Sequence, residues 1–325
     1  MTPGKRAVEE CARIIEGSVE RNLGDSVLLS GGLDTTIIAH LAASARPRCY
    51  TVFFPLRDAP DIPYARSTAR RLGLDWELLE LRPEALTETL AEVIRVLRTF
   101  DPMEVRNSLT VYRGMVAARD AGFSRVMTGD GADELFAGYS FSFNLPPSQL
   151  KKRLRHLWSV MHFSSKPMAE SLGISARLPY LDGSVVDFAK TLGPSQLVGS
   201  RGGKRYGKLI LRLAFESAIG KRSAWRVKTP IEYGSGTTHL PRYYASKIGD
   251  REFARAKKDA TSRDRVQIRD KEHLEYYSIY RRAFPPPSEV ARTGLRCPCC
   301  GADVRPASSF CLTCGAYPIT PVRAE

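Results

Sequence analysis

The feature that most constrains this chain is a pair of adjacent glycines between a short apolar segment and a predicted helix. Residues 26–29 are apolar after the first serine, residues 30–36 have the sequence SGGLDTT, and residues 36–45 show a helical pattern. Adjacent glycines allow backbone conformations that other residues avoid, and amides at the start of a helix bind anions. The GKS/T ending of a Walker A loop and the GxGxxG pattern of a dinucleotide-binding loop are both missing. We therefore predict a phosphate-binding loop of another kind, at the point where a strand ends.

Apolar, β-branched and aromatic segments alternate with helical patterns through the first half of the chain. Further strands are predicted at 49–54, 76–81 and 125–128, with helices between them. Strands that alternate with helices form parallel sheets whose two faces are covered. The fold class that follows is α/β: a twisted parallel sheet with helices on both faces, and a mostly helical second half from about residue 150.

An aspartate in the middle of a phosphate loop needs an explanation, because two anions repel each other. Asp34 is compatible with phosphate when a cation lies between them, and Mg²⁺ prefers carboxylate and phosphate oxygens. The hydroxyl groups of Ser30, Thr35 and Thr36 would add hydrogen-bond donors. An ordinary Gly-Gly turn, with Asp34 capping the next helix, is the alternative.

A second loop argues for the magnesium site. The sequence TGDGADE at 128–134 follows a predicted strand and places Asp130, Asp133 and Glu134 within five residues. Clustered carboxylates repel one another unless a metal or a proton-transfer function keeps them together. Because the carboxyl ends of parallel strands meet at one edge of a sheet, both loops are expected to converge on one magnesium-bound pyrophosphate group.

Five of the seven cysteines lie between residues 297 and 314, in two CxxCG patterns. Four thiolates at this spacing predict a closed tetrahedral Zn²⁺ site. The predicted ligands are Cys297, Cys300, Cys311 and Cys314. So small a segment depends on its metal to fold. We expect three parts: a main domain at 1–285, a linker at 286–296 and a zinc ribbon at 297–325.

The net charge of +14 is unevenly distributed along the chain. Residues 1–150 carry 17 Lys and Arg against 20 Asp and Glu, whereas residues 151–228 carry 16 against 4. A basic surface attracts polyanions, so RNA is one expected partner, and a solvated surface that serves ATP is the alternative. The sequence contains no apolar stretch long enough for a transmembrane helix and no signal-peptide pattern, so we expect no membrane contact and a cytoplasmic location.

Four segments, in order, carry a resemblance to a known family. SGGLDTT resembles the signature of the PP-loop ATP pyrophosphatases, which have a HUP-like α/β fold. VMTGDGADELFAGY, ISARLPYLD and WRVKTPIEYGSG are similar to segments of the synthetase domain of asparagine synthetases. The similarity covers roughly residues 20–240. β-Lactam synthetases share this domain, so the resemblance defines the chemistry better than the substrate.

The resemblance implies roles for individual residues. In that family the two loop aspartates hold Mg²⁺, which here would be Asp34 and Asp133. The essential lysine corresponds to Lys228, which would contact the α-phosphate or the leaving pyrophosphate with Arg226 assisting. The acidic residue beside the reaction centre corresponds to Asp130. The implied nucleotide-binding residues are Leu28, Ser30, Gly31, Gly32, Asp34, Thr35, Thr36, Phe54 and Gly129.

Three more basic residues precede the WRVKTP segment. Lys204, Arg205 and Lys208 are further candidates for phosphate contact, because their ammonium and guanidinium groups suit phosphate oxygens. A solvated helix face is the alternative interpretation of all three.

Two departures from the family affect the expected substrates. Glutamine-dependent members begin with a glutaminase domain whose nucleophile is a cysteine directly after the initiator methionine. Thr2 stands at that position here, so we expect that domain to be absent and nitrogen to come from ammonia, another amine or a separate glutaminase. Ser175 stands where the family usually has Glu, on the expected substrate side, which argues against aspartate as the substrate.

The first function that the resemblance implies is an AMP-forming carbon–nitrogen ligase of amino-acid biosynthesis that uses ATP, Mg²⁺ and a small carboxylate. The carboxylate would attack the α-phosphorus of ATP, and ammonia or an amine would convert the acyl-adenylate into an amide. The alternative is a tRNA-modifying PP-loop enzyme that adenylates a nucleobase, which the basic segment, the cysteines and the missing glutaminase favour. A non-catalytic ATP-binding scaffold is a third hypothesis, against which Asp34, Asp133 and Lys228 argue.

Overall fold

The computed structural model describes residues 3–55, 59–306 and 308–323. Contacts within the chain divide it into two compact units. The first unit comprises Met1–Phe53, Ala59–Leu79 and Gly114–Ser235. The second unit comprises Phe54–Asp58, Glu80–Arg113 and Gly236–Glu325.

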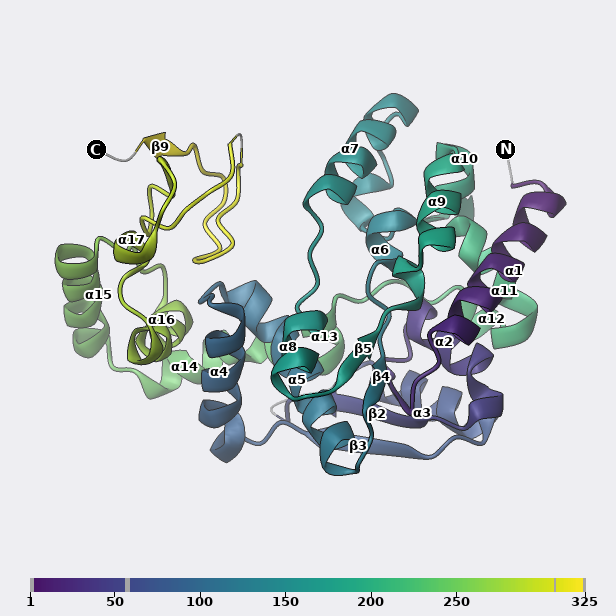
Figure 1. Ribbon diagram of the computed structural model, residues 1–325, viewed down its shortest axis with the longest axis horizontal. Helices are drawn as coiled ribbons and strands as arrows, with labels where there is room; N and C mark the ends of the chain where they lie inside the picture. Colours follow the sequence, from purple (N-terminus) through teal and green to yellow (C-terminus); the bar gives the residue numbers. More distant parts are fainter. Residues whose placement is uncertain (1–2, 56–58, 307, 324–325) are drawn as a thin grey trace. The chain divides into compact units, whose positions relative to one another are not determined.

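Five short strands form the sheet of the first unit, in the order β3-β2-β1-β4-β5 (Figure 1). Their bounds are Ser26–Leu28 for β1, Arg48–Phe53 for β2, Trp76–Glu80 for β3, Arg125–Met127 for β4 and Ser175–Arg177 for β5. β1 runs parallel to β2 and to β4, and β4 runs parallel to β5. The predicted α/β class is confirmed, and the first four strands match their predicted positions to within one residue. β5 was not predicted, because three polar or small residues show no strand period.

Helices make up most of the rest of the first unit (Figure 1). They are α1 Lys5–Arg21, α2 Leu33–Leu41, α3 Ile62–Leu72, α6 Ala132–Leu135, α7 Pro147–Val160, α8 Ser165–Ser171, α9 Gly183–Thr191, α10 Pro194–Leu197, α11 Leu209–Ile219, α12 Lys221–Ala224 and α13 Ile231–Ser235. A two-stranded hairpin, β6 (Gly199–Arg201) with β7 (Lys204–Tyr206), interrupts the half that we expected to be mostly helical. α2 begins directly after the glycine pair, three residues earlier than predicted.

The two faces of the sheet are both covered, as the alternation of strand side chains requires. Val27 belongs to a large apolar cluster together with Cys49 and residues of α1, α2 and α11. Leu28, the next residue, points the other way. A Cβ atom at Gly114, in α5 (Pro102–Asp120), would lie only 2.6 Å from Leu28 Cδ2. The absence of a side chain at Gly114 therefore lets this helix approach β1 closely.

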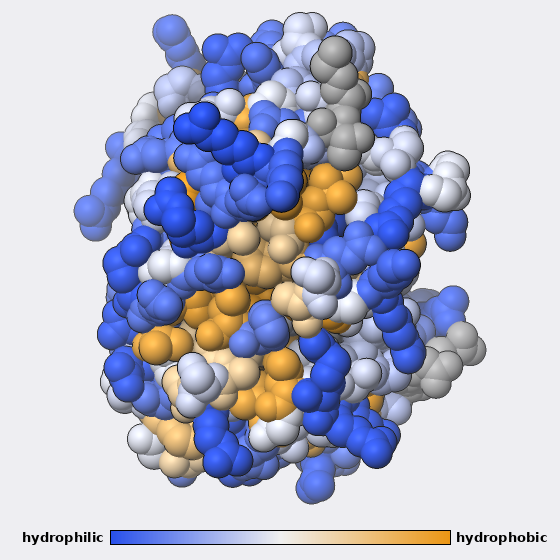
Figure 2. Space-filling view, turned by 90° about the vertical axis from the view of Figure 1, so that its right-hand side faces the viewer, coloured by the Kyte–Doolittle hydropathy of each residue, from blue (hydrophilic) through white to orange (hydrophobic). Residues whose placement is uncertain are grey.

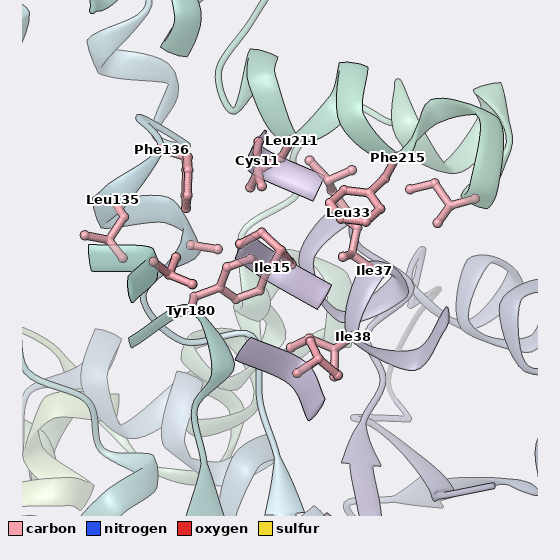
Figure 3. Close-up of a cluster of buried hydrophobic side chains, with 14 of the residues drawn as sticks. Cys11, Ile15, Leu33, Ile37, Ile38, Leu135, Phe136, Tyr180, Leu211 and Phe215 are labelled. Carbon is pink, nitrogen blue, oxygen red and sulfur yellow. The ribbon is translucent and has the colours of Figure 1, made fainter. Parts of the chain in front are cut away.

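The apolar cluster joins α1, α2, α6 and α11 on one face of the sheet (Figure 3). Cys11 and Ile15 of α1 point into it beside Leu33 and Ile37 of α2, and Phe215 lies above them (Figure 3). All five side chains are at most 6% exposed. Burial raises the pKa of the Cys11 thiol, so this cysteine packs in the core and is not a nucleophile.

Figure 2 shows the side of the molecule on the right of Figure 1, where α1, α11 and α12 are labelled. Apolar residues form a band across the middle of this side, framed by hydrophilic ones (Figure 2). α1 packs partly buried Ala7, Val8, Ala12 and Ile14 against the core cluster. Within the part of the chain that the structure describes, no helix is long and apolar enough to cross a bilayer.

The second unit is built mainly from helices. They are α4 Pro83–Leu97, the first half of α5, α14 Leu240–Lys247, α15 Asp250–Asp264, α16 Lys271–Ala283 and α17 Pro287–Val290, followed by the two-residue strands β8 (Leu295–Arg296) and β9 (Val322–Arg323). Tyr276, Tyr277 and Tyr280 of α16 are at most 3% exposed. Phe100 contacts the rings of Tyr277 and Tyr280 at centroid distances of 5.0 and 5.1 Å. These tyrosines therefore form the core of the unit.

Glu272 makes the stability of the second unit depend on pH. Its side chain is 2% exposed, Arg106 Nε lies 3.3 Å from Oε1, and the Tyr276 hydroxyl donates to the same oxygen at 2.8 Å. Burial raises the pKa of Glu272 to about 7, although Arg106 and Tyr276 oppose the shift. A carboxyl group whose pKa is raised in the folded state stabilises the fold fully when the pH is below its pKa in the unfolded chain. This stabilisation is lost as the pH rises through the folded-state pKa of about 7.

We expect the free energy of unfolding of the second unit to fall by about 3 kcal/mol as the pH rises from 4.5 to 7. Glu272→Gln should remove this dependence on pH. Pulsed hydrogen exchange of α16 after incubation in urea, at pH 5 and pH 8, measures both. The same pH dependence in the variant would show that another group causes it.

Candidate functional site

The first loop folds through its glycines and its own hydroxyl groups. Gly31 has a φ of 68°, and a Cβ atom there would lie 2.3 Å from the amide nitrogen of Ala65, so only glycine fits. Ser30 Oγ accepts a hydrogen bond from the Gly32 amide at 3.2 Å and lies 3.1 Å from Thr35 Oγ1. The loop therefore turns sharply from the end of β1 into α2.

The second loop lies against the first, because β1 and β4 are neighbours in the sheet. Gly131 has a φ of 92°, which turns the chain from β4 into the short helix α6. A Cβ atom at Gly129 would lie 3.2 Å from Asp34 Cβ and 3.2 Å from Thr35 Cγ2. The structure therefore brings the two predicted loops together at the carboxyl ends of adjacent parallel strands.

Lys208 lies between the carboxylates of the two loops. Its Nζ is 2.5 Å from Asp34 Oδ2 and 2.8 Å from Asp133 Oδ1, and its side chain is 4% exposed. Burial disfavours a charged ammonium, but the two carboxylates outweigh this and raise the pKa of Lys208. The solvated-helix interpretation is wrong for Lys208, which precedes α11 and has a φ of 55°. Lys204 and Arg205 are exposed, as that interpretation expected, but they lie on strand β7 and not on a helix.

Lys228 approaches the same aspartate from the other side. Its Nζ lies 2.7 Å from Asp133 Oδ2 and 5.1 Å from the centroid of the Tyr139 ring. The Tyr139 hydroxyl donates to Glu134 Oε1 at 2.5 Å. The side chain of Lys228 is 27% exposed, so this lysine, unlike Lys208, is accessible to solvent and to a ligand.

Asp133 carries one lysine on each of its carboxylate oxygens. Burial works against its ionisation, but the ammonium groups of Lys208 and Lys228 outweigh burial and hold the pKa of Asp133 well below its usual range. Asp133 is therefore ionised at neutral pH. The two carboxylates and two ammonium groups together form a compact cluster of fixed charge.

Arg226 has a structural environment of its own. Its guanidinium forms an ion pair with Asp61, donates to the Ser30 carbonyl at 3.4 Å, and lies 4.0 Å from the centroid of the Tyr64 ring. Its predicted assistance in catalysis stays a prediction. Asp61 was missed in the sequence because nothing near it resembles a motif. A Cβ atom at Gly234 would lie 2.1 Å from Asp61 Oδ2, which explains the glycine in the IEYGSG segment.

The remaining predicted residues occupy varied positions. Asp130 accepts a hydrogen bond from the buried hydroxyl of Ser165 at the start of α8. Thr36 is buried, and its Oγ1 lies 3.5 Å from Thr68 Oγ1. Phe54 belongs to the second unit, where its ring packs edge-on against Tyr243. Its implied role in nucleotide binding stays a prediction.

Ser175 lies on β5, the strand next to β4 in the sheet. It is the first residue of β5, pairs with Arg125 at the start of β4, and is exposed. The two loops follow the carboxyl ends of β1 and β4, whereas Ser175 lies at the amino end of its strand. The expectation that Ser175 borders the substrate, and the argument against aspartate that follows from it, stay predictions.

The cysteine cluster has the geometry of a closed metal site. The four predicted ligand sulfurs lie within 4.8 Å of one another, and each cysteine is at most 2% exposed. The two halves fold alike: Gly301 N donates to Cys297 O and Gly315 N to Cys311 O, and both glycines have φ above 70°. Four converging sulfurs fit a tetrahedral thiolate-binding metal, as the CxxCG spacing predicted.

The donor set of the two loops also fits a hard cation. Asp34 Oδ1 is buried and accepts no hydrogen bond from the residues that the structure describes. An ionised carboxylate oxygen in this condition is poorly satisfied unless a cation or a further donor reaches it. Asp133 offers oxygens of the same kind: Oδ2 accepts a hydrogen bond from Lys228 at 2.7 Å. Oδ1 forms an ion pair with Lys208 at 2.8 Å and, like Asp34 Oδ1, accepts no hydrogen bond from the residues that the structure describes.

A parallel sheet with glycine loops of this kind at the carboxyl ends of two neighbouring strands defines an α/β protein whose ligand site lies at this edge of the sheet. The family model for asparagine synthase matches residues 25–168 and 159–277 of the chain. The chain therefore belongs to the asparagine synthase family.

Curated relatives agree with this assignment. A probable glutamine-hydrolysing asparagine synthetase of Dictyostelium discoideum is 29% identical over 270 residues, covering 73% of this chain and 48% of the relative. Asparagine synthetase B of Escherichia coli, also glutamine-hydrolysing, is 27% identical over 310 residues, covering 86% and 54%. The chain thus spans about half the length of the curated relatives that it matches.

Among solved structures, an NMN synthetase from Francisella tularensis aligns with 70% of this chain and 98% of its own, at 16% identity and a TM-score of 0.30. An ammonia-dependent NAD synthetase from Campylobacter jejuni aligns with 70% of this chain and 96% of its own, at 17% identity and the same TM-score.

Proposed function

We propose that the chain is an ATP-dependent, AMP-forming ligase that converts a carboxylate into an amide. The observation that carries the proposal is that Lys208 and Lys228 meet Asp34 and Asp133 at the neighbouring carboxyl ends of β1 and β4. Fixed ammonium groups in a partly closed site stabilise the charge that develops on a leaving pyrophosphate. Membership in the asparagine synthase family supports the same chemistry.

Each part of the proposed site has a distinct task. The amides and hydroxyls of the first loop would hold the triphosphate, and Lys228, the more exposed lysine, would contact the α-phosphate or the leaving pyrophosphate. Mg²⁺ held by Asp34 and Asp133 would neutralise charge on the phosphate oxygens. A carboxylate oxygen would then attack the α-phosphorus to give an acyl-adenylate and pyrophosphate. An amine would attack the acyl carbon and release AMP.

The partners of this reaction follow from the same proposal. Nitrogen would come from ammonia, from another amine or from a separate glutaminase, and the carboxylic acid stays unassigned. We propose Zn²⁺ for the four-cysteine cluster and a zinc-ribbon role for residues 297–325, after a main domain at 1–285 and a linker at 286–296. The cytoplasmic location expected from the sequence stays a prediction.

A screen of pyrophosphate release against amino acids, other small carboxylic acids and ammonia tests the proposal. We expect release that depends on both ATP and one acid. Asp34→Asn should abolish it, because Asp34 supplies a buried, charged oxygen that accepts no hydrogen bond from the described residues. Turnover that is unaltered in Asp34→Asn would exclude catalysis at this site.

A second candidate function, adenylation of a base in tRNA, is favoured by the surface of α7. Lys151, Lys152, Arg153 and Arg155 on this helix are exposed, and residues 135–169 contain no Asp or Glu. Such an uncompensated basic face suits a phosphate backbone. Adding tRNA to the screen separates the two functions, since pyrophosphate release that requires tRNA and no free acid would favour this one.

Gly138 offers a further test, because a side chain there would occupy the cluster itself. A Cβ atom would lie 1.8 Å from Asp133 Oδ1 and 2.3 Å from Lys208 Cε. We expect Gly138→Ala to displace these flexible side chains and slow pyrophosphate release by on the order of 10²-fold, while the fold survives. The control is Gly183→Ala at the start of α9, where nothing lies within 4 Å. Equal rates in the two variants would contradict the assignment.

A further inference from the structure

Arg212 is a buried cation in the first unit without a carboxylate of its own. It lies on α11 between Leu211 and Phe215, which are labelled in the core cluster in Figure 3, and it is 3% exposed. None of the ion pairs of the described residues includes it. Burying an unpaired charge is costly unless hydrogen bonds compensate for the lost water. The position of its guanidinium therefore needs an explanation beyond packing.

The guanidinium donates to three backbone carbonyls. Nε donates to Gly207 O at 2.8 Å, and Nη1 donates to Ala224 O at 2.6 Å and to Arg226 O at 3.0 Å. These acceptors come from two segments, one directly before α11 and one that begins at the last residue of α12. A single planar side chain therefore joins two stretches of chain that no ladder of secondary structure connects.

Each of these two segments carries a lysine of the charged cluster. Gly207 immediately precedes Lys208, whose amide donates to Phe136 O at 2.9 Å. Arg226 lies two residues before Lys228. Moving either carbonyl away from Arg212 would move the neighbouring lysine relative to Asp133.

Two aromatic rings fix the plane of the guanidinium. Arg212 Cζ lies 5.0 Å from the centroid of Tyr206 and 5.9 Å from that of Trp225, which meet edge to face at 5.2 Å. Arg201, which is exposed and paired with Glu216, lies against the same Trp225 ring at 4.3 Å. Arg201 touches Trp225 but donates to none of the three carbonyls, so it is a matched control.

We propose that Arg212 is a positioning residue that keeps Lys208 and Lys228 in place on the two sides of Asp133. The proposal rests on the function assigned above to that cluster. An arginine is needed because a fork of planar N–H donors reaches carbonyls in different directions, which the single ammonium of lysine cannot do from one place. A residue that only filled space in the core would not need to donate hydrogen bonds to the two segments that carry the lysines.

The test compares Arg212→Lys with Arg201→Lys in the full chain. We expect Arg212→Lys to lower kcat for pyrophosphate release by about 100-fold with KM for ATP changed less than threefold, and Arg201→Lys to leave both unchanged. Similar kcat values in the wild-type protein and Arg212→Lys, or equal losses in the two variants, would overturn the proposal. If Arg212→Lys does not fold, Arg212→Gln replaces it, because a neutral amide removes the buried charge but cannot span three carbonyls.

Hydrogen exchange gives a readout that does not depend on turnover. In Arg212→Lys the amides of Lys208 and Arg226, which donate to Phe136 O and Ser223 O, should exchange at least tenfold faster than in the wild-type protein, while α2 and β1 are unchanged. Unchanged exchange at these amides would refute the positioning role even if kcat fell. A wild-type protein that releases no pyrophosphate would instead refute the proposed function and leave this comparison valid.

Discussion

Replacing Lys208 with methionine is expected to lower the free energy of unfolding of the first unit by about 3–5 kcal/mol and to abolish pyrophosphate release. The ammonium of Lys208 is the shared partner of Asp34 and Asp133, at 2.5 and 2.8 Å. Without it two largely buried carboxylates face each other: Asp34 loses a charge-assisted hydrogen bond, and Asp133 loses one of its two ion pairs. Methionine keeps the length and apolar character of the side chain, so the loss reports the charge.

Lys228→Met separates this structural effect from the catalytic one. Lys228 is 27% exposed and pairs with a single carboxylate that Lys208 also neutralises. Its removal should therefore cost at most about 1 kcal/mol of stability, as for other partly exposed pairs, but it should stop pyrophosphate release as completely as Lys208→Met.

Tryptophan fluorescence in urea measures the stability of the first unit in both variants, because Trp76, Trp158 and Trp225 all belong to it. Equal unfolding midpoints for Lys208→Met and Lys228→Met would contradict the assignment of Lys208 to the buried bridge. Normal turnover in Lys228→Met would remove this lysine from the reaction.

On the zinc assignment proposed above, removal of the metal from the cysteine cluster is expected to unfold residues 295–306 and 308–323. Structural Zn²⁺ contributes on the order of 10 kcal/mol or more to the folding of such small segments. The effect should spread to residues 99–101 of the same unit. Thr99 Oγ1 donates to Leu312 O at 2.7 Å, and the Phe100 amide donates to Thr313 O at 2.8 Å. Arg269 Nη2 also donates to Cys314 O at 2.8 Å.

Metal content and hydrogen exchange measure the unfolding that follows removal of the metal. A strong chelator or Cys300→Ser should remove the bound zinc and the exchange protection of Phe100, whereas Cys299→Ser should retain one zinc per chain. Cys299 is the matched control, because it lies next to Cys300 but outside the group of four converging sulfurs. Protection that persists after complete loss of zinc would show that this segment folds without a metal.

The parts of the site that the sequence predicted are those that a local pattern encodes. Glycines that adopt positive φ, such as Gly31 and Gly131, mark loops that must turn sharply after a strand. Asp34 and Asp133 lie on those loops, and neighbouring parallel strands bring them together. The cysteine spacing likewise sets four sulfurs around one point with little help from the rest of the chain.

The parts that the sequence did not predict depend on contacts between distant residues. Lys208 meets Asp34 across 174 positions, and Arg226 meets Asp61 across 165, so no window of sequence contains either pair. Lys208 shares its basic surroundings with Lys204 and Arg205, and only the tertiary structure shows which of the three is buried.

The most direct test of the central claim identifies the nucleotide that ATP becomes. ATP labelled at the α-phosphate is incubated with the wild-type chain, Mg²⁺, ammonia and a mixture of carboxylic acids, and the nucleotides are then separated. We predict labelled AMP and an equal amount of pyrophosphate, formed only when the acids are present and absent with Asp34→Asn. Labelled ADP as the product, or AMP formed at the same rate by Asp34→Asn, would contradict it.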